Sequence, residues 1–591
     1  MLENVSNSSE RCLAWLKAFS GFLENKNVAK LEELFHDRCF WRDLLSFTWN
    51  IKTSEGLKQV KSTFASTKSS IVAKSLKILD VSNEEGEKIS SWFSFETNYG
   101  KCRGQLILVK GRCEVLFTIL EDLTGFEEKQ KETRPAGLVH KAHKDRKTWK
   151  EIRTRELIEI GNTQQPHVLV IGGGQGGLAL ATRLKQLNIP TLLVEKNAKI
   201  GDSWRNRYRT LVLHDPVWYD HMPYLQFPEN WPTFTPKDKL GDWLEAYSSI
   251  FELNVWTKTE CIKANFNEES KNWHVNLLKE GENIEIKAKE IVFATGAYGP
   301  AKEINWAKKE TYKGILIHSS EYKEAKIFQG KNCLVVGAAS SAHDIAVDLW
   351  EAGANVTMLQ RSPTTVVKSE TLMEMGFPIY SQQAVNDGID VDKADLISAA
   401  TPFTLFKEQQ IELYKEIRKM DTEFYNKLEK SGFKLDFGED ESGLMMKALR
   451  TASGYYIDVG ASELISNGEI KIISGDEVIS MHPTGVLLSS GRKIEMEVII
   501  ACTGYQSMHE TVAQIVSREV ADKVGPCWGL GSGVKGDPGP WQGELRNMWK
   551  PTAIDSLWFH GGNLAMSRFY SKILALQLKA RQENLDISVI N

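Results

Sequence analysis

The spacing of apolar residues divides the chain into three regions. Residues 1 to about 130 begin with helical spacing and continue as alternating strands. Within them, GQLILVKGRCEVLFTILEDL predicts two antiparallel strands around the turn Lys110-Gly111-Arg112. Residues 131–165 are charged and poor in apolar residues, which indicates a linker with some helix. From His167 onward, apolar runs that end in glycine are followed by helical periodicity, a pattern typical of α/β folds.

The first glycine-rich segment is HVLVIGGGQGGLALATRLKQLNIPTLLVEK. Val168–Ile171 predicts a buried strand, and a helix follows the three glycines of a G-x-G-x-x-G turn, Gly172, Gly174 and Gly177. The first permits a tight turn, the second lets the backbone approach a pyrophosphate, and the third lets helix and strand pack closely. A second strand, Thr191–Val194, ends at Glu195, which can accept hydrogen bonds from a ribose. Together these features predict a dinucleotide site at the helix N-terminus.

A second segment, KNCLVVGAASSAHDIAVDLWEAGANVTMLQRS, repeats this order. The predicted strand Cys333–Val336 leads to a turn whose three key positions are Gly337, Ala339 and Ala342. Ala339 replaces the middle glycine and slightly crowds the approach of a pyrophosphate. The next predicted strand, Val356–Leu359, ends in Gln360 and Arg361.

The ends of the two second strands differ in charge. Glu195 lies 23 residues after Gly172, and Gln360 lies 23 residues after Gly337. An acid would repel a 2′-phosphate, whereas Arg361 can pair with one. The first site is therefore expected to hold FAD or NAD and the second NADP(H), unless Arg361 forms only a surface salt bridge.

Two further strands end in a Thr-Gly turn. They are EIVFATGAY (290–298) and EVIIACTGY (497–505), and such strands return the chain beneath a nucleotide. The first is expected to close the FAD fold after an insertion, and the second to lead from the NADP fold back into it. Two nucleotide folds in series indicate electron transfer between cofactors.

Composition narrows the functional classes. The formal net charge is -4, so no basic field indicates nucleic acid or an anionic membrane. The 8 cysteines are scattered without a CxxC pair, which argues against a metal site and a disulfide framework. No apolar run approaches the length of a membrane span, and the N-terminus lacks the apolar core of a signal peptide. We expect a cytoplasmic protein.

Between the two glycine-rich turns, the chain resembles class B flavoprotein monooxygenases, the flavin-containing monooxygenase family. Their signature is F-x-G-x-x-x-H-x-x-x-(Y/F), and here Tyr312, Gly314, His318 and Tyr322 stand at its positions, with Tyr312 in place of the leading Phe. The order of motifs is similar from about 166 to 580. Tyr322, where Baeyer–Villiger relatives usually carry Trp, favours the heteroatom-oxygenating or YUCCA-like branches.

The resemblance assigns roles to further residues. Trp204 and Arg205 are expected to line FAD. His214 stands where many members carry an Asn that helps to hold the flavin hydroperoxide, and it either donates to the peroxide or packs. A helix from about Ala565 is expected to aim its N-terminus at the flavin pyrimidine. Arg568 and Tyr570 on that helix either face the pocket or contact another domain.

The expected fold class is α/β, with two Rossmann-type dinucleotide-binding domains, the NADP domain inserted in the FAD domain, and an N-terminal α+β cone-like domain. Residues 1–130 resemble the SnoaL-like fold; there His36, Trp41 and Asp43 either form a pocket or, as we favour, pack. The expected boundaries are 1–130, a linker at 131–165, the FAD domain at 166–330, the NADP domain at 331–496, and the FAD return segment with the C-terminal helix at 497–591.

The resemblance implies an NADPH-dependent flavin monooxygenase that forms a 4a-hydroperoxyflavin and inserts one oxygen atom into a small organic substrate. Amines, sulfides, ketones and 2-keto acids all stay open as substrates, and molecular oxygen is the co-substrate. Alternatives are an NADPH oxidase or flavin reductase, including a flavin disulfide reductase, and a cofactor-binding interaction protein. We expect no nucleic acid, membrane or metal as a partner, and a homodimer stays open. The candidate catalytic residue is His214, and the cofactor-binding candidates are Gly172, Gly174, Gly177, Glu195, Lys196, Trp204, Arg205, Thr295, Gly296, His318, Gly337, Ser340, Ser341, Arg361, Thr503, Gly504 and Asn563.

Overall fold

The computed structural model describes residues 7–67, 73–84, 87–138, 140–142, 144–296 and 298–590. Its N-terminal part is a six-stranded mixed sheet in the order β2-β1-β6-β5-β4-β3, where β1 and β6 run parallel and the other neighbours antiparallel. The strands are β1 (Phe35–Leu44), β2 (Ile51–Glu55), β3 (Lys74–Glu84), β4 (Lys88–Glu96), β5 (Gly100–Val109) and β6 (Arg112–Leu123).

Three helices accompany this sheet: α1 (Ser8–Glu24), α2 (Leu31–Leu34) and α3 (Gly56–Ser66). α1 buries Trp15 and Phe19 in an aromatic cluster with residues of the sheet. The predicted hairpin is confirmed, because β5 and β6 pair around Lys110 and Gly111, whose φ angles are 48° and 78°. The described residues of this part therefore form a sheet with helices beside it, and their buried apolar side chains belong to one cluster with residues of the following part of the chain.

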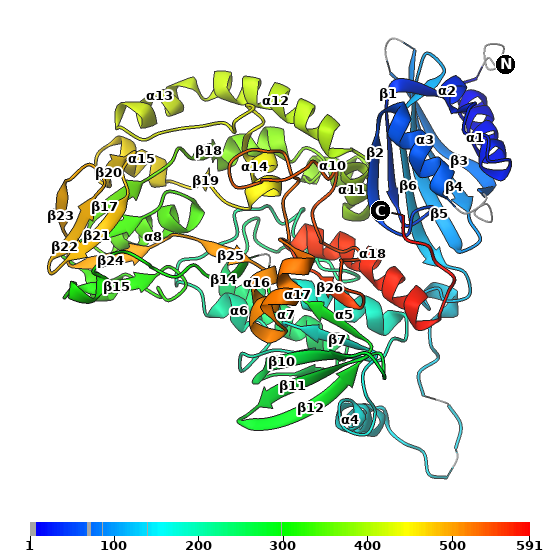
Figure 1. Ribbon diagram of the computed structural model, residues 1–591, viewed down its shortest axis with the longest axis horizontal. Coiled ribbons are helices and arrows are strands. Elements are labelled where there is room, and N and C mark those ends of the chain that lie inside the picture. Colours follow the sequence, from blue (N-terminus) through cyan, green and yellow to red (C-terminus); the bar gives the residue numbers. More distant parts are fainter. Residues whose placement is uncertain are drawn as a thin grey trace.

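A five-stranded parallel sheet forms the centre of the molecule. Its order is β26-β13-β7-β8-β9, from β7 (Val168–Ile171), β8 (Thr191–Val194), β9 (Val255–Trp256), β13 (Glu290–Phe293) and β26 (Leu557–Phe559). Helices α5 (Gln175–Gln186) and α18 (Leu564–Gln582) pack against each other beside it. The antiparallel sheet β10 (Thr259–Asn267), β11 (Asn272–Lys279) and β12 (Glu282–Ala288) extends from this region (Figure 1).

A second parallel sheet has the order β15-β24-β16-β17-β20. Its strands are β15 (Ile315–His318), β16 (Asn332–Val336), β17 (Asn355–Gln360), β20 (Lys471–Ser474) and β24 (Val498–Ala501), and α8 (Ser340–Glu351) follows β16. This sheet extends past the expected limits of 331–496 at both ends. β24, expected to lead the chain from the NADP fold back into the first fold, pairs with β15 and β16 in this sheet, and the chain then continues to β26 of the first parallel sheet.

The remaining elements cover and connect the two parallel sheets. A meander of β21 (Val478–His482), β22 (Gly485–Leu488) and β23 (Lys493–Glu495) follows the second sheet, and β14 (Tyr298–Ala301) pairs with β25 (Tyr505–Ser507) between the two. A largely helical insertion lies between β17 and β20. It contains β18 (Thr365–Lys368), α9 (Ser369–Thr371), α10 (Gln382–Asn386), α11 (Val391–Ala399), α12 (Phe403–Met420), α13 (Thr422–Lys430), α14 (Gly443–Thr451), β19 (Tyr455–Asp458) and α15 (Ala461–Ser466).

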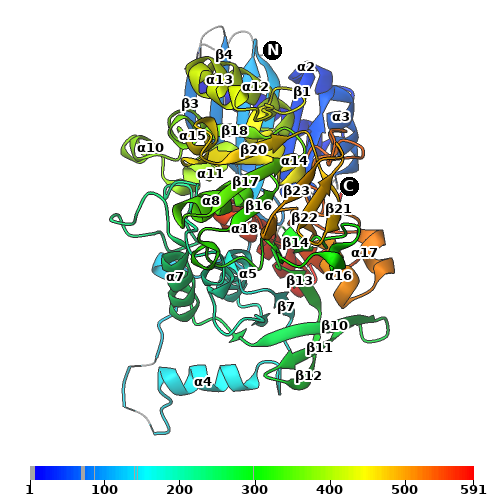
Figure 2. The ribbon, with the colours of Figure 1, turned by 90° about the vertical axis from the view of Figure 1, so that its left-hand side faces the viewer.

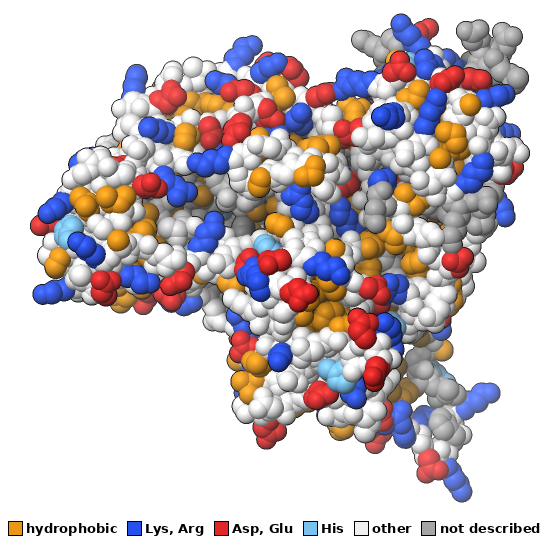
Figure 3. All heavy atoms as spheres, in the orientation of Figure 1, with side chains coloured by type: hydrophobic (Ala, Val, Ile, Leu, Met, Phe, Trp, Pro, Cys, Tyr) orange, Lys and Arg blue, Asp and Glu red, His pale blue; other side chains and the backbone are white. Residues whose placement is uncertain are grey.

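The described residues of the expected linker include the 3-10 helix η1 (Lys131–Thr133) and the helix α4 (Trp149–Glu159), whose Arg153 donates to Leu253 and Asn254 before β9. Figure 2 shows the connection to α4 running as an extended loop away from the domains. Further helices are α6 (Asp202–Arg205), α7 (Lys237–Ile250), α16 (His509–Ile515) and α17 (Arg518–Val524). In the face drawn in Figure 3, positive and negative side chains are interspersed. Among the described residues, no helix combines the length and the apolar character that a bilayer span needs.

Candidate functional site

The turn after β7 is shaped by three glycines with different surroundings. Gly172 has a φ of 111°, and a Cβ there would lie 2.4 Å from the Ala294 carbonyl oxygen. A Cβ on Gly177 would lie 1.9 Å from the carbonyl oxygen of Gly172, so close packing of helix and strand requires glycine. Gly174 differs, because the nearest atom to its Cβ position is Ser203 Oγ at 3.9 Å. Packing within the chain does not require glycine at position 174. The absence of a side chain there leaves open space in front of α5.

The N-terminus of α5 faces this open space without a side-chain cap. Gly174 is its N-cap residue and supplies no side chain, so the first N–H groups of the helix have no intrahelical acceptor. Aligned peptide dipoles add partial positive charge there. A pyrophosphate fits both features, since it brings acceptor oxygens and negative charge.

Glu195 at the end of β8 is buried and organises the same turn. Its Oε2 accepts the Gly173 N–H at 2.8 Å, and its Oε1 accepts the Asn197 N–H at 2.8 Å. A carboxylate oxygen has two lone pairs, so each can accept one further hydrogen bond from a ribose hydroxyl. The neighbouring Lys196 is exposed.

We call the open space in front of α5 the first cradle. The segment 560–563 and α6 form one wall of it. Gly561 Cα lies 3.2 Å from the Cβ position of Gly176 in α5. Gln175 Nε2 donates to the Gly562 carbonyl oxygen at 3.1 Å, and Trp204 Nε1 donates to Gln175 Oε1 at 3.3 Å. The structure therefore brings Trp204 to the turn where the sequence predicted a flavin contact.

Arg205 has a different set of partners from those predicted. Its guanidinium donates to Asp202, Asp242 and Glu245 at 3.0, 2.9 and 2.6 Å and to the Ile200 carbonyl oxygen at 2.9 Å. These contacts hold α6 against α7. Contact of Arg205 with FAD stays a prediction.

The N-cap residue of α18, Asn563, fixes the start of this helix beside the first cradle. Asn563 Oδ1 accepts the Met566 N–H at 2.9 Å, and Asn563 Nδ2 donates to Tyr219 Oη at 3.2 Å. The helix begins at Leu564, one residue before the predicted start. Thr295 and Gly296 follow β13 and are exposed. They come directly after Ala294, whose carbonyl oxygen packs on Gly172.

The second turn repeats the geometry of the first. Gly337 has a φ of 132°, and a Cβ there would lie 2.6 Å from the Cys502 carbonyl oxygen, the equivalent of Ala294. Ala339 is the N-cap of α8 and provides no side-chain cap. The half-buried Ser340 and Ser341 open the helix, and Ser340 Oγ donates to the Tyr455 carbonyl oxygen at 3.1 Å. The replacement of glycine by Ala339 therefore keeps an uncapped helix N-terminus.

Thr503 and Gly504 follow β24 beside this second turn. His318 Nε2 donates to the Gly504 carbonyl oxygen at 3.2 Å, and its Nδ1 lies 2.9 Å from Ser320 Oγ. Tyr322 is fully buried and donates to Asp348 at 2.6 Å. Within the described part of the chain, these contacts give His318 and Tyr322 a structural role in holding the turn and α8.

The end of β17 carries a buried amide and an exposed cation. Gln360 is fully buried, and its Oε1 accepts from the Lys434 N–H at 2.8 Å and Ser474 Oγ at 3.0 Å. Its Nε2 donates to the Lys434 carbonyl oxygen at 2.8 Å. Gln360 is therefore committed to the fold, whereas the side chain of Arg361 is 72% exposed and lies 3.9 Å from Glu477.

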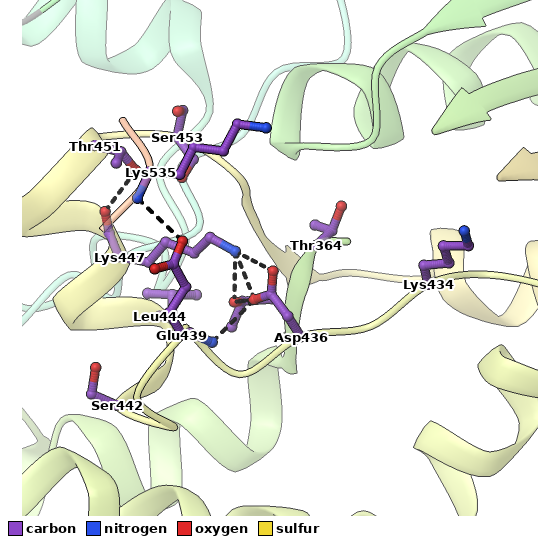
Figure 4. A network of polar contacts seen from close by, with 12 residues as sticks. Thr364, Lys434, Asp436, Glu439, Ser442, Leu444, Lys447, Thr451, Ser453 and Lys535 are labelled. Carbon is purple, nitrogen blue, oxygen red and sulfur yellow. Dashed lines mark hydrogen bonds and ion pairs between the residues drawn. The ribbon is translucent and has the colours of Figure 1, made fainter. Parts of the chain in front are cut away.

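Lys434 comes from the helical insertion, which sequence reasoning did not connect with this site. The Thr364 N–H donates to the Lys434 carbonyl oxygen at 3.1 Å, and Figure 4 shows the Lys434 side chain apart from the ion pair of Lys447 with Asp436. Both Lys447–Asp436 distances are 2.6 Å, and Thr364 Oγ1 donates to the Ala338 carbonyl oxygen at 2.8 Å. The insertion thus brings the Lys434 backbone to the end of β17 and the Lys434 ammonium close to Gly475, which follows β20.

His214 lies between the two nucleotide folds. Its Nε2 is 3.5 Å from Asp344 Oδ1 on α8, and Tyr208 Oη donates to Asp344 Oδ2 at 2.5 Å. The ring also makes an edge contact with Tyr456 at 6.3 Å between centroids. His214 therefore touches the second fold from a segment that follows the first.

Two carboxylates that follow His214 in the chain, the half-buried Asp215 and the buried Asp220, were missed by the sequence analysis. Asp220 is 1% exposed, and neither of its oxygens has a hydrogen-bond partner among the described residues. Burial and the nearby Asp215 hold the pKa of Asp220 well above its ordinary value. Burial also raises the pKa of Asp215, to about 6. The segment LHDPVWYD places the two acids 5 residues apart, a spacing that would put them on different faces of a helix, so the sequence gives no signal that they lie together.

Arg568 and Tyr570 prove to be domain contacts. Arg568 is 2% exposed and binds Asp395 of α11 through two hydrogen bonds of 2.7 and 2.8 Å. It also donates to the Tyr219 and His221 carbonyl oxygens at 2.9 and 2.8 Å. The ring of Tyr570 is stacked on Trp549 at 3.9 Å.

The three N-terminal candidates do not gather in one pocket. His36 and Asp43 lie at opposite ends of β1, and His36 Nε2 donates to the Val109 carbonyl oxygen at 2.8 Å. The Asp43 carboxylate accepts from Thr118 Oγ1 at 2.6 Å and Thr48 Oγ1 at 2.7 Å, and Trp41 Nε1 donates to Thr118 Oγ1 at 3.0 Å. The favoured interpretation, packing and hydrogen bonding, is confirmed for these residues.

Comparison with known proteins identifies similar oxidoreductases. The model of the family described as pyridine nucleotide-disulphide oxidoreductase matches residues 169–409. The probable indole-3-pyruvate monooxygenase YUCCA10 of Arabidopsis thaliana is 29% identical over 345 residues, which are 58% of this chain and 82% of that protein. Among curated proteins of rice, the indole-3-pyruvate monooxygenase YUCCA1 of Oryza sativa subsp. japonica is 28% identical over 351 residues, 59% of this chain and 79% of that protein.

A solved structure covers a similar region. The flavin-containing monooxygenase from Stenotrophomonas maltophilia has a TM-score of 0.46 and 15% identity, over 71% of this chain and 99% of that one. The matched family and the curated relatives support an oxidoreductase similar to flavoprotein monooxygenases. In the described residues, no three or more His, Cys, Asp or Glu side chains are grouped as metal ligands.

Proposed function

We propose that the chain is an FAD- and NADPH-dependent monooxygenase of small organic molecules. The observation that carries the proposal is the repeated turn: in each fold an uncapped helix N-terminus follows a left-handed glycine whose Cβ position is filled by a carbonyl. Two such turns in one chain fit two dinucleotides. When bound, FAD accepts hydride from NADPH and supplies the oxygen-activating chemistry.

The first turn suits FAD. The first N–H groups of α5 would donate to the pyrophosphate, and Glu195 would accept from a ribose. Trp204 and the segment 560–563 would form the wall of the cradle. The N-terminus of α18 would place positive partial charge beside the flavin ring.

The second turn suits NADPH rather than NADH. Gln360 brings no charge, and its amide is already bonded to the fold, so it cannot select an unphosphorylated ribose. Arg361 is exposed at the same strand end and would pair with a 2′-phosphate. Lys434 would add a second cation, because its ammonium lies close to Gly475, whose N–H donates to the Gln360 carbonyl oxygen at 2.7 Å.

His214 and the Asp215–Asp220 pair lie where the folds meet. A monooxygenase has to exclude water from the reacting centre, and every residue of the segment 213–222 is buried or half-buried. His214 would donate one hydrogen bond toward the centre, and the burial that raises the pKa of Asp220 would favour the protonated carboxyl there.

The direct test is the colour and redox cycle of the purified chain. FAD should co-purify or rebind with one equivalent per chain, be bleached by NADPH without oxygen, and be restored by air. A colourless protein that never binds FAD would contradict the proposal. The disulfide reductase alternative has little support, because all eight cysteines are unpaired and seven of them are buried.

A further inference from the structure

The N-terminal domain reaches the core of the catalytic part through one arginine. Arg42 of β1 is 1% exposed, and Glu544, which precedes β26, is 2% exposed. The guanidinium binds the carboxylate twice, with Nε to Oε1 at 2.7 Å and Nη2 to Oε2 at 2.8 Å. Arg42 Nη1 donates to the carbonyl oxygen of Ala399 at 2.5 Å, and Thr53 Oγ1 donates to Glu544 at 2.7 Å. One side chain thus joins the N-terminal domain, the helical insertion and the C-terminal segment.

Burying an ion pair costs free energy, so the pair is tolerated only where its partners are held in a favourable geometry. Desolvation of two charges costs several kcal/mol per ion unless close hydrogen bonds compensate it. Every oxygen of Glu544 accepts a hydrogen bond from Arg42, and the bidentate contact fixes the orientation of both groups. Small shifts between the domains would therefore break several bonds at once.

The pair continues toward the first cradle through two stacked rings. Arg42 Nη2 donates to Tyr570 Oη at 3.2 Å. The ring of Tyr570 lies 3.9 Å from that of Trp549 at an angle of 6°. Trp549 Nε1 donates to the Gly561 carbonyl oxygen at 3.2 Å, and Gly561 packs on Gly176 in the first turn of α5.

We propose that Arg42 is a positioning residue for the flavin site, which acts through Tyr570 and Trp549 on the segment 560–563. The inference rests on the proposed function, because it assigns FAD to the first cradle. It gives the N-terminal domain a role in cofactor binding, without any contact between that domain and the cofactor.

The test measures FAD binding in matched variants. Arg42→Met removes the guanidinium, and Arg42→Met combined with Glu544→Gln also removes the carboxylate charge that would be left buried. Arg38→Met is the control, because Arg38 pairs with Glu408 across the same interface but is 61% exposed. The readouts are the FAD dissociation constant from flavin fluorescence, the visible circular dichroism of bound FAD, and the melting temperature without FAD.

We expect the FAD dissociation constant to rise at least tenfold in the double variant and less than twofold in Arg38→Met. The visible circular dichroism should change only in the Arg42 variants. Trp549→Phe keeps a ring but removes the donor to Gly561, so it should weaken FAD binding in the wild-type background and add little to the Arg42→Met effect.

A folded double variant with wild-type FAD affinity and circular dichroism would overturn the inference, as would full additivity of Arg42→Met and Trp549→Phe. These results are separable from failure of the proposed function. A wild-type chain that binds no FAD contradicts both. A chain that binds FAD but never oxygenates a substrate contradicts the proposed reaction and leaves the positioning role to stand on the binding data.

Discussion

At the scale of single residues, we expect two glycines of the first turn to have different roles: Gly177 is needed for folding, and Gly174 is needed for binding. Nothing in the chain lies closer than 3.9 Å to a Cβ on Gly174, whereas a Cβ on Gly177 would meet a carbonyl at 1.9 Å. Gly174→Val should therefore give a folded protein without FAD, and Gly177→Ala should lower stability by about 1–3 kcal/mol. Urea unfolding and flavin absorbance distinguish the two. Full FAD occupancy in a soluble Gly174→Val protein would refute the placement of FAD.

Coenzyme preference depends on the exposed cation after β17. Arg361→Ala should raise the KM for NADPH about tenfold and leave the KM for NADH nearly unchanged, since a charge-assisted hydrogen bond contributes about 1.5–3 kcal/mol. Steady-state kinetics with both coenzymes checks this. Equal effects on NADPH and NADH would leave Arg361 as a surface residue.

His214 is the candidate residue for stabilising, by a hydrogen bond, the activated oxygen that bound FAD would supply. His214→Ala should keep FAD and its rate of reduction by NADPH, while several times more NADPH ends as hydrogen peroxide, because loss of one donor costs about 1–3 kcal/mol. The matched control is Asp344→Asn, which keeps His214 but weakens its contact of 3.5 Å with the second fold, together with the hydrogen bond from Tyr208. If both variants uncouple equally, His214 serves as a domain contact and not as a donor.

Among the elements, the two strand–turn–helix units could be read directly from the sequence. β7 and β8 have the predicted bounds, because a buried strand followed by glycines leaves little freedom. The insertion between β17 and β20 could not be connected with the second site, since Lys434 reaches it only through tertiary contacts with Gln360. Asp220 was missed for a similar reason: its burial depends on helices distant in the sequence, including α18 with Arg568.

The helix α8 should make the second fold sensitive to acid. Burial lowers the pKa of His343 to about 4, from 6.5 in an unfolded chain, and its ring stacks on Tyr456 at 4.0 Å. Between pH 6.5 and 4 the unfolded state binds a proton that the folded state does not, so stability falls as the pH falls through this window. His343→Phe should reduce the loss of unfolding free energy between pH 7.5 and 4.5 by about 2–3 kcal/mol. An unchanged difference in urea titrations at the two pH values would contradict this.

In the whole molecule, the N-terminal domain is joined to the catalytic part from several directions. The C-terminal tail returns to it, since the Ile590 N–H donates to the Thr48 carbonyl oxygen at 2.8 Å and Tyr99 Oη donates to the Asp586 carbonyl oxygen at 2.7 Å. Figure 1 shows the C-terminus lying beside this domain. A separate sheet was predictable from alternating residues in 1–130, but its attachment was not, because Arg42 and Glu544 are 502 residues apart.

A monooxygenase inserts one atom of O₂ into its substrate and uses the electrons of NADPH to reduce the other atom to water. The most direct measurement supplies ¹⁸O₂ to the FAD-loaded chain with NADPH and one amine, sulfide, ketone or 2-keto acid at a time, and quantifies labelled product, NADPH and hydrogen peroxide together. We predict that at least one substrate class gains one ¹⁸O atom per NADPH consumed, while hydrogen peroxide falls in proportion. If no class acquires label and every NADPH appears as hydrogen peroxide or reduced disulfide, the chain is an oxidase or reductase and the account is wrong.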